Sequence, residues 1–340
     1  FLKKIWRNFY IKSEILKRLK LFRLVYNYSS NSNFVFNLNT LCNFKYKDFL
    51  LDVHLISMNL LIKSGVLPKS ITHLSIGSNC GLEPGSIPNR VKKLTFRNQF
   101  NNNDVQIVPY IIPNSVEILH FISYNSTQRY DVNVIPPSVH TLLITNICHP
   151  LEYGSIPPSV TNLEVGFDQP HKPNVIPPSV TVLAINTSIE YLTIDSIPNS
   201  VKHLVFDNFK NEKIPPNCIP SSVEYLEFSN SYNQPIDGSF FKDIKTSNLK
   251  TIVFGSRFNN KILPGSLPNS LKSITFGFHY NLKLEETNIP KGVEHIKFNY
   301  IFNQALKGLP DSLTKLELGY CFDQPILPNT LPQNLHYLEF

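Results

Sequence analysis

The sequence has no apolar run near the ~20 residues that a membrane-spanning helix needs, although 42% of its residues are hydrophobic. Its first 25 residues lack the continuous apolar core and the cleavage site of a signal peptide. Cysteine is scarce: the 340 residues include only five cysteines, which are odd in number and far apart in the sequence. We therefore expect no membrane span, free thiols and a reducing, cytoplasmic environment.

Catalytic and metal-binding motifs are also missing from the sequence. It contains no phosphate-binding loop, no G-x-G-x-x-G, no H-E-x-x-H and no pair of cysteines at metal-ligand spacing. We expect neither an enzyme nor a cofactor or metal site.

The net charge is +7, but most of the chain carries equal numbers of basic and acidic residues. Eight of the 32 basic residues, but only Glu14 of the 25 acidic ones, lie in the first 25 positions, which leaves 24 of each sign. Because the remainder is neutral, we do not expect it to bind nucleic acid.

Proline, in contrast, recurs at a regular interval. Residues 196–206 read SIPNSVKHLVF, and close copies stand at 86–96, 155–165, 266–276 and 308–318. The spacing of about 20 to 25 residues is typical of a solenoid. Residues 244–254 fit one further unit without the proline, which makes about thirteen repeats. The repeat prolines are Pro68, Pro88, Pro113, Pro136, Pro157, Pro177, Pro198, Pro220, Pro268, Pro290, Pro310 and Pro332.

Each repeat carries the alternation of a short strand. Apolar residues stand three, six and eight positions after the proline, as Val201, Leu204 and Phe206 do after Pro198. Positions six and eight share one face of a strand, and the residue before a proline is held extended. The remaining ~15 residues of a unit are too short and too rich in proline for a crossover helix with two loops. We predict a mainly β repeat solenoid with one parallel sheet and an extended or polyproline-like outer side.

A second motif follows the strand, an aromatic residue and then Asn or Asp. Examples are YNQPI at 232–236, FNQAL at 302–306 and FDQPI at 322–326. Short amide or carboxylate side chains hydrogen-bond exposed backbone N–H groups. We hypothesise that these residues stack as a ladder; the alternative is a solvated turn residue.

The combined pattern IPNSVxxLxF followed by FNQPI resembles the FNIP repeat, a relative of the leucine-rich repeat in social amoebae and some giant viruses. The resemblance covers about 63–340 and departs from the pattern at 244–254, 99–110 and 124–134. It implies a curved, leucine-rich-repeat-like solenoid with the parallel sheet on its concave side.

Residues 1–62 differ from the repeats at 63–340. Their apolar spacing predicts a basic amphipathic helix over 2–24, and we expect the segment to cap the first coil. Two alternatives stay open. One is an F-box-like docking segment, which the family sometimes carries, although the Leu-Pro start of that motif is missing here; the other is a membrane-surface helix.

Positions five, seven and nine after each proline are expected to face outward from the sheet. The first coils place Lys93 and Arg97 there, and the last coils place mixed charge, in which we interpret Glu317 and Glu339 as solvated surface carboxylates. The middle coils are unusually apolar, which favours a partner-binding patch, although β-branched residues also favour strands in general. The candidate residues are Ile118, His120, Ile122, Leu143, Val182, Ala184 and Val205.

The sequence thus predicts a non-catalytic scaffold that binds a protein partner on the concave face of a solenoid. A substrate receptor of a ubiquitin ligase, docked through residues 1–62, is the alternative. The chain starts at Phe1 with Met58 as its single methionine and stops at Phe340 within a repeat strand. We expect either further chain or an open edge able to pair end to end.

Overall fold

The computed structural model describes residues 12–13, 16–17, 35–56, 61–77, 80–97, 107–126, 129–147, 149, 151–167, 174–186, 192–207, 210–285 and 288–340. The chain divides into two compact units, Phe1–His140 and Thr141–Phe340, each of which is described by itself. The helix predicted over 2–24 lies almost wholly outside the described residues. Of it, residues 12–13 and 16–17 are described, and these are helical.

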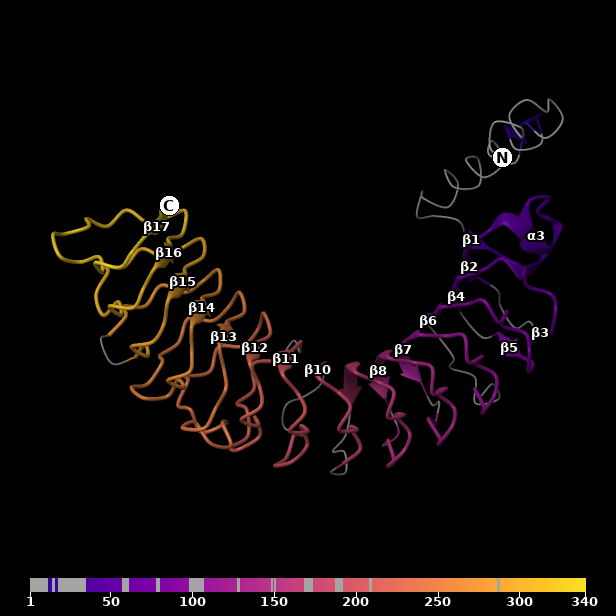
Figure 1. Ribbon diagram of the computed structural model, residues 1–340, viewed down its shortest axis with the longest axis horizontal. Helices are drawn as coiled ribbons and strands as arrows, with labels where there is room; N and C mark the ends of the chain where they lie inside the picture. Colours follow the sequence, from indigo (N-terminus) through magenta and orange to yellow (C-terminus); the bar gives the residue numbers. More distant parts are fainter. Residues whose placement is uncertain are drawn as a thin grey trace. The chain divides into compact units, whose positions relative to one another are not determined.

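The first unit is built on a parallel ladder of strands (Figure 1). Its members pair in the order β1, β2, β4, β6 and β7, and β3 pairs separately with β5. The strands are β1 (Val35–Phe36), β2 (Asp52–Ile56), β3 (Leu61–Ile62), β4 (His73–Gly77), β5 (Gly81–Leu82), β6 (Lys93–Arg97) and β7 (Ile118–Ser126), with helix α3 (Leu38–Asn43) and the 3-10 turn η1 (Lys47–Phe49) between β1 and β2.

The second unit continues the same repeat with one strand per coil, and its strands follow the inner side of its curve (Figure 1). Every neighbouring pair that is described is parallel. The register is continuous in these pairs except between β8 and β9, where it shifts between Ile144 and Ile147. The strands are β8 (Thr141–Ile147), β9 (Asn162–Phe167), β10 (Val182–Ile185), β11 (His203–Phe206), β12 (Tyr225–Glu227), β13 (Thr251–Val253), β14 (Ser273–Thr275), β15 (His295–Lys297), β16 (Lys315–Glu317) and β17 (Tyr337–Glu339).

The repeat proline marks the corner that leads into each strand. The N–H of Val201 donates to the carbonyl of Pro198 at 3.1 Å and closes a tight turn. The hydroxyl of Ser200 donates to the carbonyl of Val180 in the preceding coil at 2.7 Å. Asp195, three residues before the proline, has a φ of 67°, a left-handed conformation that Gly, Asn and Asp tolerate. Each coil is therefore tied to its neighbour at the corner as well as through the strand.

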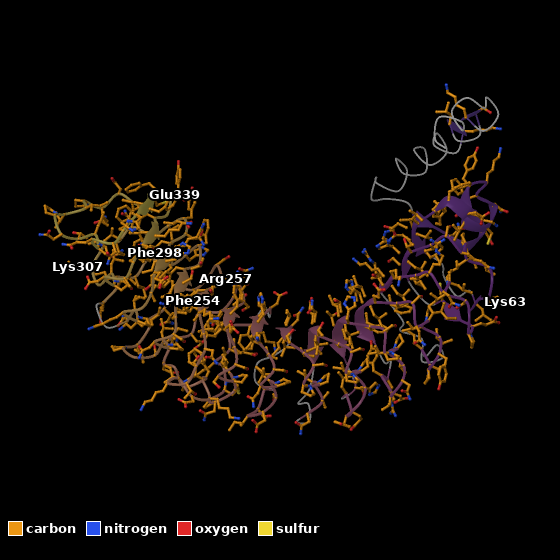
Figure 2. The ribbon with its side chains drawn as sticks, in the orientation of Figure 1. Lys63, Phe254, Arg257, Phe298, Lys307 and Glu339 are labelled. Carbon is orange, nitrogen blue, oxygen red and sulfur yellow. The ribbon has the colours of Figure 1, made fainter. Side chains whose placement is uncertain are left out.

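The core of the second unit contains stacked aromatic rings. Phe254, Phe276 and Phe298 follow one another with ring centroids 5.7 and 5.0 Å apart; Phe254 and Phe298 are labelled in Figure 2. A second column, formed by the aromatic residue of the turn motif, stacks beside them, as Tyr280 does at 4.1 Å from Phe276. Such rings bury a large apolar area at favourable offset geometry.

The turn asparagines form the hypothesised ladder. Asn233 Oδ1 accepts from the backbone N–H of Asn259 at 2.8 Å, Asn259 from Asn281 at 3.0 Å, and Asn281 from Asn303 at 2.9 Å. The ladder starts at Asn211, which accepts from Asn233, and reaches Asp323, which donates to Asn303.

The structure confirms the predicted fold class, a leucine-rich-repeat-like parallel solenoid with little helix. Among the described residues between 61 and 340 none is helical, as predicted for the outer side. The parallel ladder also includes β1 and β2, which lie before residue 63. The division of the chain at residues 62 and 63 stays a prediction.

Candidate functional site

The strand-lined face is the surface formed by strand residues whose side chains point away from the core. In β10 and β11 every second residue is half-buried and the residues between are buried. The half-buried positions stand five and seven after the repeat proline. Because one coil follows another in register, each position forms a continuous row across the strands.

The seven predicted partner-binding residues all lie on this face, in two groups. Ile118, His120 and Ile122 follow one another on β7 of the first unit, where Ile122 is 38% exposed and the other two are half-buried. The second unit carries the remaining four residues, all half-buried, on three strands: Leu143 on β8, Val182 and Ala184 on β10, and Val205 on β11.

A carboxylate at outward position seven, Glu164, divides the second group. Ala184 pairs in register with Val205 on one side and with Glu164 on the other, and Glu164 pairs with Leu143. Burial raises the pKa of Glu164, and the negative charge of Asp207 raises it further. The apolar surface is therefore continuous over Val182, Ala184 and Val205, whereas Leu143 lies beyond an acidic group.

Position nine faces outward in only part of the chain, which corrects the sequence interpretation. Arg97 and Asp207 occupy it and are exposed. In later coils the chain bends inward directly after the strand, and Ser229, Gly255 and Gly277 are buried there. A Cβ on Gly277 would overlap the carbonyl oxygen of Gly255. From β12 onward, the outward face is thus two rows wide.

The charged cluster of the last coils also differs from the expectation. Glu317 is only 8% exposed, so its interpretation as a solvated carboxylate was wrong. It lies 2.6 Å from Lys297 Nζ, 2.7 Å from Lys315 Nζ and 3.0 Å from His295 Nε2. Burial alone would raise its pKa, but hydrogen bonds from the two lysines and the histidine outweigh burial and hold the pKa at about 2. Glu339, labelled in Figure 2, is exposed and accepts from Tyr337.

A hollow of about 210 Å³ opens on the strand-lined face of the first unit. Ser75 and Thr95 lie at its floor, and His54, His73, Lys93 and Arg97 surround them. The sequence interpretation placed Lys93 and Arg97 on this face, but it did not combine them with the hydroxyl groups. Ser75 and Thr95 both stand seven positions after a repeat proline, and Lys93 and Arg97 stand two residues before and two after Thr95. This shared position in the repeat could have identified the site from the sequence.

Metal chemistry finds no support in the described part of the chain, where no three His, Cys, Asp or Glu side chains gather as a metal site. The described residues also contain no helix that is both long and apolar enough to cross a bilayer.

Comparison with known proteins identifies the repeat. The FNIP Repeat family matches residues 59–99, 79–121, 149–188, 190–231, 211–241, 232–279, 280–321 and 302–340, which together cover well over half of the chain. A FNIP repeat-containing protein of Dictyostelium discoideum is 33% identical over 100 residues, which are 29% of this chain and 16% of that protein.

A solved structure shares the fold. CroV588, described as a novel circular LRR protein, aligns with a TM-score of 0.58 and 27% identity over 89% of this chain and 58% of its own. A leucine-rich repeat protein from Eubacterium ventriosum aligns over 91% of this chain and 89% of its own with 13% identity, and its TM-score of 0.22 carries no argument. The chain spans less than two thirds of the Dictyostelium protein and of CroV588.

Proposed function

The chain belongs to the FNIP repeat family, and we propose that it serves as a non-catalytic scaffold that binds a protein partner on its strand-lined face. Repeat solenoids present extended concave surfaces of this kind to their partners. The partner surface that fits is apolar at its centre and polar around it.

The observation that carries the proposal is the apolar surface over Val182, Ala184 and Val205. These side chains occupy outward positions on two neighbouring strands, where a solvated sheet face normally carries polar residues. His203 borders them on β11 and Glu164 on β9. An apolar centre with a polar rim is the typical anatomy of a protein interface.

Substitution of the apolar centre tests the proposal. Proximity labelling in cells first identifies partners, and binding is then measured with purified proteins. We expect Val182→Asp and Val205→Asp, both within the apolar centre, to weaken binding at least about tenfold, because a buried carboxylate at an interface centre costs more than about 1.4 kcal/mol.

Thr251→Asp is the matched control, since Thr251 is a half-buried outward residue of β13 outside the apolar surface. Circular dichroism must stay unchanged for all three variants. Equal binding by Val182→Asp, Val205→Asp and Thr251→Asp would remove the apolar surface from the proposal.

The ligase-receptor alternative gains no specific support from the described residues. Its test is a deletion that ends at residue 34, because β1 and β2 pair within the parallel ladder and removal of residues 1–62 would damage it. Ligase components that co-purify with the full chain and are lost on this deletion would establish the alternative.

A further inference from the structure

The hollow of the first unit has a floor of two neighbouring hydroxyl groups. Ser75 on β4 and Thr95 on β6 pair in register, which places them about 4.8 Å apart. They are 7% and 5% exposed, and neither hydroxyl has a hydrogen bond to a described residue. Buried polar groups are normally hydrogen-bonded, so two such hydroxyls at the floor of a hollow are available to a ligand.

Cationic side chains surround this floor. Lys93 and Arg97 stand two residues before and two after Thr95 on β6, about 6.6 Å away along the strand on either side. Both side chains are long enough to reach over the hydroxyl. Neither forms an ion pair with a described residue. Side chains that end in nitrogen are visible along the inner side of the strands of this unit (Figure 2).

Histidines complete the wall. His73 lies beside Lys93, and His54 lies beside Ser75 in register. His120 lies beside Thr95 on the other side. Burial lowers the pKa of His120, and the charges of Lys93 and Arg97 lower it further, as expected at a positive potential. The acidic group that lines the hollow is Asp52, at 3.7 Å from His54.

We propose that this hollow binds the phosphoryl group of a phosphorylated side chain on the partner protein. A tetrahedral phosphoryl group accepts hydrogen bonds from several directions at once. It could therefore bind both the hydroxyl groups at the floor and the Arg, Lys and His side chains at the sides, whereas a planar carboxylate could bind fewer of these donors. The inference rests on the proposed scaffold function and adds a charged contact to it.

The neighbouring residues specify what stands beside the phosphoryl group. Ile118 pairs with Lys93 and Ile122 with Arg97 on the adjacent strand, so an apolar surface borders the hollow directly. A phosphorylated segment with apolar residues near its phosphate fits both. A nucleic acid would require a long cationic track, but beyond residue 25 the chain carries 24 basic and 24 acidic residues.

Inorganic phosphate is the first probe, added to the full chain at constant ionic strength with chloride as the reference. The histidine ring signals in NMR report the position of binding. We expect saturable shifts of His54, His73 and His120 and none of His203, His279 and His295 in the second unit. If phosphate moves no histidine of the first unit, or moves all six alike, the hollow is not an anion site.

Two variants locate the contacts. Arg97→Gln removes a charged donor and Thr95→Val removes a hydroxyl with little change of shape, and we expect each to weaken phosphate binding, Arg97→Gln about tenfold or more. Arg257→Gln is the matched control, since Arg257 is an exposed arginine of the second unit that Figure 2 labels. Identical titrations of Arg97→Gln and Arg257→Gln would overturn the inference.

Two further probes separate the sources of phosphate. A short peptide with phosphoserine between leucines should shift the same histidines at lower concentration than phosphate, and its serine counterpart should not. A single-stranded RNA decamer that binds more tightly than the phosphopeptide would overturn the assignment to a protein partner. The scaffold function fails separately, because Val182→Asp tests it without touching the hollow, and Arg97→Gln tests the hollow without touching the apolar surface over Val182, Ala184 and Val205.

Discussion

Glu317 shows how a single residue on an outward strand position becomes part of the interior. The sequence places it in the same register as Glu339, and nothing in that register distinguishes the two carboxylates. The difference comes from neighbours on β15 and β16, because the side chains of Lys297, Lys315 and His295 contact the Glu317 carboxylate. A buried carboxylate stays charged only with such partners.

The low pKa of Glu317 predicts a specific loss of stability in acid. Its pKa is about 2 in the folded chain, against an ordinary value of 4.5. A depressed pKa stabilises the folded state above the unfolded value, and this contribution is lost as the pH falls from 4.5 through about 2. It amounts to at most about 3 kcal/mol. Urea unfolding between pH 7 and pH 3 measures it.

Glu317→Gln should therefore be less stable than the parent at pH 7, with the difference shrinking toward pH 3. Glu339→Gln serves as the control, because Glu339 is exposed. Parallel curves for the parent and Glu317→Gln would contradict the assigned pKa.

At the scale of the coil, the turn motif explains why the strands become short. β6 has five residues, whereas each strand from β12 onward has three. In these later coils the chain leaves the sheet after position eight, and the asparagine ladder then supplies the hydrogen bonds between neighbouring coils. The pattern of aromatic residue and asparagine predicted the ladder, but strand length depended on the close backbone approach at position nine.

Gly277→Ala tests that close approach. A methyl group there would collide with the backbone oxygen of Gly255, which cannot move aside as a flexible side chain would. We expect a loss of about 1–3 kcal/mol or more in the free energy of unfolding. Thermal and urea unfolding measure it.

Gly292→Ala is the matched control, because its nearest neighbour would lie 3.4 Å away, an ordinary contact. It should change stability little. Similar losses in both variants would show that the effect is one of glycine in general and not of coil stacking.

At the scale of the whole molecule, a solenoid is held together by contacts between neighbouring coils. Phe276 is fully buried and stacks on one ring from the coil before and one from the coil after. We expect Phe276→Ala to cost about 3–5 kcal/mol and to act locally. Amide hydrogen exchange should show reduced protection in β13, β14 and β15 and unchanged protection in β8 and β9.

Phe278→Ala is the control for this prediction, since Phe278 is 41% exposed. It should leave the exchange of β13 to β15 close to that of the parent. Uniform loss of protection over the second unit after Phe276→Ala would contradict nearest-neighbour stability and indicate a single cooperative body.

The architecture of the coil follows from the sequence alone: the proline corner, the buried triplet such as Val201, Leu204 and Phe206, and the stacked asparagines. These features are local and recur about every 20 to 25 residues, so a correct interpretation of one unit applies to the others. It also placed the seven candidate residues on the outward face, because strand alternation needs no tertiary information.

The burial and the charge pairing of those outward residues, in contrast, came from the tertiary structure. Counting from the repeat prolines already places Glu164 between Leu143 and Ala184, and Ser75 beside Thr95, and the strand pairing agrees. The structure adds that Glu317 is buried against two lysines and a histidine and that Ser75 and Thr95 form the floor of a hollow. Burial, charge pairing and hollows depend on the side chains of adjacent coils, and the spacing within one repeat carries no information about them.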